Sequence, residues 1–138
     1  MNNPGRNLLA SILLILLASA NSFAQTQAEL NRDACATYKN ADAEMNRTYK
    51  QILDKYLRET VFIEKLKAAQ RAWIKFRDAD LESLYPERDT LSAYGSVNPM
   101  CRCIAVSELT KERTKSLKRW VDGVEEGDVC AGSIKTKN

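Results

Sequence analysis

Histidine is absent from this sequence of 138 residues, which also contains only 5 glycines and 3 prolines. Without histidine, the chain lacks the commonest general base and metal ligand at neutral pH. Ser-His-Asp and Cys-His catalytic arrangements are therefore excluded, and no Cys-x-x-Cys pair is present to suggest redox chemistry. Gly95 and Gly127 belong to no phosphate-binding pattern. We predict that the protein is not an enzyme and has no catalytic residues, no metal and no cofactor.

Glycine and proline are also missing from the long stretch between Gly5 and Pro86. Apolar residues recur there at helical spacing, so strands and tight hairpin turns are disfavoured. We therefore predict an all-α protein. The expected architecture is a small antiparallel three-helix bundle, formed by a helical hairpin and a third helix.

Long apolar runs are limited to Leu8–Leu17, which is too short for a comfortable membrane span. Arg6 precedes this run, and Ser22-Phe23-Ala24 has the small residues that signal peptidase accepts at positions −3 and −1. We interpret residues 1–24 as a cleaved signal peptide and residues 25–138 as one domain. No cysteine near the cleavage point is available for lipidation. The mature protein is thus predicted to be periplasmic or secreted, without a membrane anchor.

The first helix is predicted to begin at a capping box formed by Thr26 and Glu29 and to end near Leu57. The direction of the apolar stripe changes after this helix, which predicts a break near Glu59 and Thr60. The inward-facing residues of the first helix are expected to be Ala34, Tyr38, Ala41, Met45, Tyr49, Ile52 and Tyr56.

The second helix is predicted to end at Pro86, and the polar stretch that follows, through Tyr94-Gly95-Ser96 to Asn98-Pro99, is predicted to form a connecting loop. A third helix should run from about Cys101 to about Val121. Its inner face is expected to contain Ala105, Val106, Leu109, Arg113, Leu117, Trp120 and Val124. Glycines then indicate a loop-like C-terminal tail, which Cys130 is expected to hold against the domain.

The second helix carries an unusual mixture of apolar and polar residues on one face. At about 100° per residue, this face contains Leu66, Gln70, Trp73, Arg77 and Leu84. A buried guanidinium needs a carboxylate partner. If the turn lies near residue 59, Asp42 and Arg77 are each about 17 to 18 residues from it and so at one level. We predict an Asp42–Arg77 ion pair, a contact between Tyr49 and Gln70, and Arg113 sharing the carboxylate. We interpret this set, with Trp73, as a structural polar network.

The mature chain keeps about 20 basic against 18 acidic residues, a charge balance that favours no class of partner strongly. The basic run Lys111–Arg119 contains and adjoins acidic residues, and export removes most nucleic acid from reach, so no nucleic-acid binding is predicted. The sequence carries no signal for an oligomeric state.

Four cysteines in an exported domain of this size predict two disulfides, each contributing about 3 kcal/mol. They are Cys35, Cys101, Cys103 and Cys130.

Three segments resemble the lysozyme inhibitor LprI family, specifically its small N-terminal domain. They are ADAEMNRTY from Ala41, LKAAQRAWIKFRDAD from Leu66 and SELTKERTKSL from Ser107. Many relatives carry a cysteine where this chain has Leu81, so the family's disulfide connectivity does not transfer. Because Cys35 lies near the start of the first helix, it should approach the start of the third. We predict a bond from Cys35 to Cys101 or Cys103, with Cys130 taking the remaining cysteine.

The resemblance implies an exported binding protein of the bacterial envelope that inhibits a lysozyme-type muramidase. Such an inhibitor must fill a sugar-binding cleft that carries two catalytic carboxylates. The segment Leu91–Cys103 is the candidate for this contact. Tyr94 is expected to stack in the cleft where a sugar would, Ser96, next to Gly95, to form a hydrogen bond there, and Arg102 to approach a catalytic carboxylate. The segment is otherwise a simple connection between helices. A second hypothesis is a non-enzymatic envelope interaction module, or an immunity-type module, with a different protein partner.

Overall fold

The protein is described by a computed structural model that covers the backbone of residues 4–137 and the side chains of residues 26–137. It contains the helices α1 (Pro4–Lys55), α2 (Thr60–Leu84), α3 (Thr90–Tyr94) and α4 (Asn98–Asp122). No strand occurs among these residues, which confirms the all-α class. No helix of the described chain is both long and apolar enough to cross a membrane.

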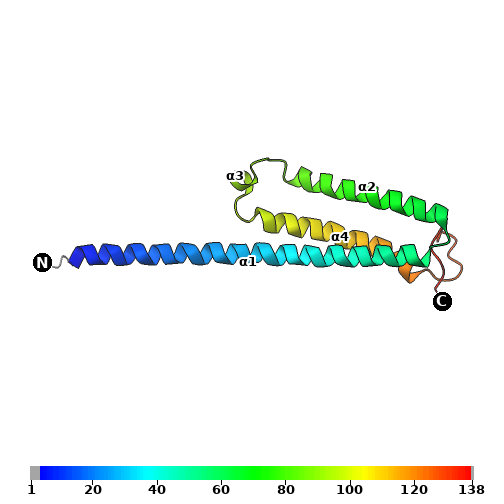
Figure 1. The fold of residues 1–138 in the computed structure, drawn as a ribbon, viewed down its shortest axis with the longest axis horizontal. Coiled ribbons are helices and arrows are strands. Elements are labelled where there is room, and N and C mark those ends of the chain that lie inside the picture. Colours follow the sequence, from blue (N-terminus) through cyan, green and yellow to red (C-terminus); the bar gives the residue numbers. More distant parts are fainter. Residues whose placement is uncertain (1–3, 138) are drawn as a thin grey trace.

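The N-terminal part of the chain is continuous with α1, which extends beyond the other helices (Figure 1). Thr26 and Glu29, predicted to cap the start of a helix, lie inside α1 instead. No glycine or proline occurs between Gly5 and Pro86, so no helix-breaking residue separates Thr26 from the preceding part of α1. The predicted signal peptide, residues 1–24, lies outside the residues whose side chains are described.

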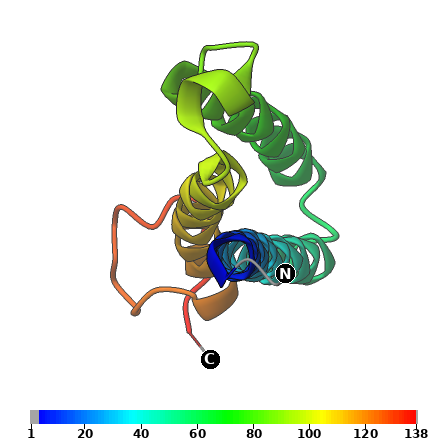
Figure 2. The same cartoon turned by 90° about the vertical axis from the view of Figure 1, so that its left-hand side faces the viewer.

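In Figure 1 the chain runs from left to right along α1, back from right to left along α2 and again from left to right along α4, so α1 and α4 are parallel neighbours (Figures 1 and 2). The break between α1 and α2 falls at Glu59, as the sequence predicts. A short extra helix, α3, interrupts the predicted loop. The predicted three-helix bundle is therefore confirmed only in part. Its main contact is between α1 and α4, not within the hairpin of α1 and α2.

The buried side of α4 explains its close pairing with α1. Ser107, Thr110 and Thr114 are 2%, 0% and 5% exposed, and their small side chains permit two helix backbones to approach. The Thr110 hydroxyl donates to the Val106 carbonyl at 2.7 Å, and the Thr114 hydroxyl donates to the Thr110 carbonyl at 2.9 Å. These bonds within the helix satisfy two buried polar groups. Hydrophobic periodicity alone did not identify these positions, because the residues are polar.

The apolar core lies where α1 ends and α2 begins. Its buried members are Met45, Ile52, Tyr56, Leu66 and Leu117. The ring centroid of Phe62 lies 4.7 Å from that of Tyr56 and 6.1 Å from that of Trp120. All inward residues predicted for α1 are buried or half-buried, which confirms that stripe. Leu84 was predicted to face inwards but is 55% exposed, because it ends α2 at the edge of the bundle.

The C-terminal tail folds back over this core. Its Val124 N–H donates to the Lys135 carbonyl at 3.1 Å, and the Lys135 N–H donates to the Tyr56 hydroxyl at 3.0 Å. Ile134 is buried beside them. The prediction that Cys130 holds the tail is wrong, since Cys130 is an exposed free cysteine. Backbone hydrogen bonds and the burial of Ile134 hold the tail instead.

The structure contains one disulfide, Cys35–Cys103, with the two Cα atoms 5.0 Å apart. This bond is one of the two alternatives predicted for Cys35, and it forms because the start of α4 lies beside the part of α1 that carries Cys35. The prediction of a second disulfide is wrong, because Cys101 and Cys130 are free. Cys101 lies in the first turn of α4 and Cys130 follows its last turn. Between them in the sequence lies most of α4, a helix of 25 residues that is about 37 Å long.

Candidate functional site

Arg77 lies half-buried on α2, and its side chain is 14% exposed. Its Nη1 atom is 3.9 Å from Oδ1 of Asp42 on α1. A shorter contact of 2.7 Å joins its Nη2 atom to Oδ1 of the adjacent Asp78. The guanidinium also lies 5.4 Å from the centroid of the Trp73 ring. Arg77 is therefore shared between two carboxylates, and Asp42 is the more distant one.

Gln70 links all three long helices. It is 6% exposed, its Nε2 atom donates to Sδ of Met45 at 3.6 Å, and its Oε1 atom accepts from Nε of Arg113 at 3.0 Å. Arg113 also lies 5.9 Å from the Trp73 ring centroid. The structure thus pairs Arg113 with Gln70 and not with Asp42. The hydrogen bonds of Gln70 go to Met45 and Arg113 and not to Tyr49.

Burial determines the charge properties of this polar network. Loss of solvation lowers the pKa of Arg113, while the nearby Tyr49 partly opposes that change. Burial also raises the pKa of Tyr49, against the opposing effect of Arg71 and Arg113. The raised pKa favours the neutral form of Tyr49, and an arginine guanidinium stays protonated in proteins. Since the polar atoms bind one another, the network is suited to fixing the positions of the helices.

We call residues 85–103 the connector; they follow α2 and include α3 and the first six residues of α4. Asp89 begins α3: its Oδ1 atom accepts from the Ser92 N–H at 3.2 Å, and its Oδ2 atom accepts from the Ser92 hydroxyl at 2.6 Å. These hydrogen bonds lower the pKa of Asp89. Gly95 ends α3 with φ 70°. The Asp-x-x-Ser spacing at residues 89–92 is the sequence signal for this missed helix.

Two of the predicted contact residues hold the connector together. The Tyr94 ring meets the Tyr85 ring edge-on at 5.4 Å, and Nη2 of Arg102 binds Oε1 of Glu82 at 2.6 Å. Arg102 also lies over the Tyr85 ring at 5.5 Å. Both side chains are half-buried. They therefore support the connector from within, in addition to any contact with a partner.

The other two predicted contact residues, Gly95 and Ser96, are exposed. The Ser96 carbonyl accepts a hydrogen bond from Nδ2 of Asn31 on α1 at 3.0 Å. The Cys35–Cys103 disulfide joins α1 to the end of the same connector. The connector is thus attached to α1 at two points, at Ser96 and at Cys103.

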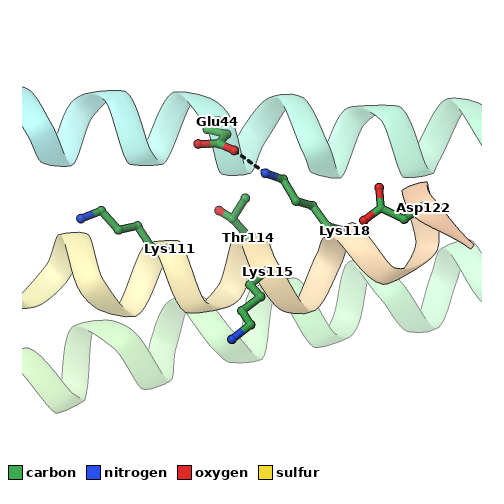
Figure 3. A pocket seen from close by; sticks show the side chains of 6 residues that line it. All are labelled: Glu44, Lys111, Thr114, Lys115, Lys118 and Asp122. Carbon is green, nitrogen blue, oxygen red and sulfur yellow. Dashed lines mark hydrogen bonds and ion pairs between the residues drawn. The ribbon is translucent and has the colours of Figure 1, made fainter.

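Of the α4 lysines drawn in Figure 3, Lys118 reaches toward Glu44 on α1, whereas Lys115 points away from α1. Nζ of Lys118 binds Oε1 of Glu44 at 2.7 Å, and Nζ of Lys111 binds Oε1 of Glu108 at 2.7 Å. The first pair lowers the pKa of Glu44 and raises that of Lys118, through the hydrogen bond and then the charge attraction. Much of the positive charge of this part of α4 is therefore balanced within the chain. Among the described residues, no group of three His, Cys, Asp or Glu is placed to hold a metal ion.

The described chain is therefore a small helical protein whose interior polar residues bind one another and whose connector presents an exposed, cross-linked turn. The family model described as "Lysozyme inhibitor LprI" matches residues 18–117, and the chain belongs to that family. An uncharacterized protein of Rhizobium meliloti (strain 1021) is 36% identical over 134 residues, covering 83% of this chain and 94% of the relative. No solved structure matches the chain.

Proposed function

We propose that this protein is an exported, non-enzymatic inhibitor of a lysozyme-type muramidase and that the connector contacts the muramidase cleft. Membership in the lysozyme inhibitor LprI family supports the protein partner and the inhibitory role. The observation that carries the site is the exposed Gly95-Ser96 turn, whose neighbours are bound to α1. A turn held before binding loses less conformational entropy in a complex.

In this proposal, the four connector residues have two roles. Gly95 and Ser96 enter the cleft, where the Ser96 hydroxyl hydrogen-bonds to polar groups that otherwise bind sugar. Tyr94 and Arg102 position that turn through Tyr85 and Glu82, and present their exposed atoms to the rim of the cleft.

Export is part of the proposal, with residues 1–24 as the signal peptide and the bacterial envelope or its exterior as the location. The apolar run after Arg6 and the Ser22-Phe23-Ala24 site support it. Mass spectrometry of the exported protein should find an N-terminus at Gln25. An unprocessed N-terminus in the exported fraction would contradict this assignment.

A muramidase assay with the purified exported protein tests the function. We expect inhibition of at least one lysozyme type at micromolar excess. Ser96→Lys should weaken inhibition by about tenfold, because it places a bulky cation in the turn. Ser83→Lys is the matched control on exposed α2 and should stay within about twofold of the parent. Equal thermal unfolding of both variants would exclude misfolding as the cause.

Absence of inhibition across several lysozyme types would overturn the proposal. It would favour the alternative of an envelope interaction module or an immunity-type module with a different protein partner. If the parent protein inhibits but Ser96→Lys and Ser83→Lys behave alike, the connector is not the contact.

A further inference from the structure

A second surface lies beside the connector, in a groove between residues 30–37 of α1 and residues 100–111 of α4. The groove has a volume of about 370 Å³. Its apolar lining includes Leu30, Ala34, Met100 and Ile104. Leu30 and Ile104 are 46% and 48% exposed, although both are large aliphatic residues. Met100 also belongs to the connector, so the groove and the exposed turn form one continuous surface.

The groove contains a buried polar atom without a partner. Ser107 lines it and is 2% exposed, yet its Oγ atom forms no hydrogen bond with the described residues. Thr110 and Thr114, the neighbouring hydroxyl residues of α4, instead bond to carbonyls one turn earlier. The accessible area of this Oγ atom is below 1 Å², so the hydroxyl lies behind the groove wall and the charged lining within reach of a ligand is Asp33, Glu108 and Lys111.

The groove also carries one uncompensated charge. Glu108 is paired with Lys111 at 2.7 Å, and Arg32, next to the groove, is paired with Glu29 at 3.9 Å. Asp33 lines the groove, is exposed and has no ion pair among the described residues. The local charge offered to a partner is therefore negative, although the whole sequence has a formal net charge of +3.

We infer that this groove binds a lysine or arginine side chain of the partner protein. The methylene stem of such a side chain packs against Leu30, Met100 and Ile104, and its cationic end reaches Asp33. Long basic side chains combine an apolar stem and a charged end, which matches this lining.

This inference rests on the proposed function, since it assigns a second contact with the same muramidase. It explains how a slightly cationic protein attracts a basic partner. The charge of the contact surface, not the net charge, determines steering and orientation. A strongly basic animal lysozyme is therefore the appropriate probe.

The test measures the Kd of the exported protein for that lysozyme by calorimetry at low and physiological salt. Asp33→Asn should weaken binding by about five- to tenfold at low salt, and less at higher salt because ions screen the lost pair. Asp54→Asn is the matched control, since Asp54 is an exposed α1 carboxylate with no ion pair among the described residues. It should change Kd by less than about twofold.

A second pair of variants tests the apolar part of the groove. Ile104→Ala should weaken binding by about three- to tenfold. Ile74→Ala removes the same atoms from a 37% exposed site on α2 and should leave the Kd nearly unchanged. Thermal unfolding of each variant checks that the fold is retained.

The outcomes separate this inference from the proposed function. If the parent protein inhibits and Ser96→Lys is defective while the groove variants match their controls, the groove assignment is wrong and the proposed function stands. If the parent protein inhibits no lysozyme, both are overturned. A groove effect that is equal at both salt concentrations would rule out the charge contact with Asp33.

Discussion

The two ends of the bundle are stabilised by different interactions. Where α1 meets α2, buried residues such as Ile52, Tyr56 and Leu117 form an apolar core that the C-terminal tail covers. At the connector end, a disulfide, an ion pair and an amide hydrogen bond hold mostly exposed chain. The first end therefore provides most of the hydrophobic stabilisation. The second end holds a defined surface in place with little hydrophobic burial.

The largest expected effect lies in the apolar end. Leu117 is 0% exposed, so Leu117→Ala should lower the free energy of unfolding by about 4 kcal/mol through lost burial and a cavity. Urea unfolding measures this change. Leu91→Ala, at a 69% exposed leucine of the connector, is the control and should have little effect. Similar losses for the two variants would contradict the contrast between the ends.

Removal of the disulfide should have the next largest effect. The double variant Cys35→Ser and Cys103→Ser should lower the free energy of unfolding by about 3 kcal/mol, because the bond closes a long loop in the unfolded chain. The rate of amide hydrogen exchange should increase more in residues 95–104 than in residues 45–56. A uniform rise over both segments would show that the connector end is not separately held.

Two glycines offer a direct comparison of the ends. Gly95 and Gly123 have φ of 70° and 77°, a region that L side chains rarely adopt. A Cβ at Gly123 would lie 2.8 Å from the Lys135 carbonyl, whereas a Cβ at Gly95 would meet nothing within 4 Å. Gly123→Ala should cost about 3 kcal/mol and Gly95→Ala about 1.5 kcal/mol. Thermal or urea unfolding measures both changes. An equal loss of unfolding free energy would mean that the tail moves away from the added methyl group at little energetic cost.

Acid should affect the connector only slightly. The hydrogen bonds from Ser92 lower the pKa of Asp89 from its model-compound value of 3.8. A carboxylate with a lowered folded-state pKa contributes stability above the unfolded value and loses it as pH falls through the folded value. The cap of α3 should therefore weaken below about pH 4, with little change above it. The NMR chemical shift of the Ser92 amide, followed as a function of pH, measures this change. A midpoint well above pH 4 would contradict the prediction.

Much of the candidate site was predictable as a set of residues, but not as a set of contacts. The helical period placed Gln70, Trp73 and Arg77 on one face of α2, and the structure brings Arg77 within 3.9 Å of Asp42. The partner of Arg113 was not predictable, because a polar side chain can reach several groups across a helix interface. The groove was also missed, since Asp33 and Ile104 come from segments about 70 residues apart.

The sequence by itself determined the helical class, the break at Glu59 and the inward stripe of α1. These features depend on local periodicity and on the absence of helix-breaking residues. Only the tertiary structure decided that α4 packs mainly on α1, that Cys35 bonds to Cys103 and that Cys101 and Cys130 stay apart. Those outcomes depend on how closely distant segments approach, and the small hydroxyl residues of α4 permit that approach only once α1 is beside them.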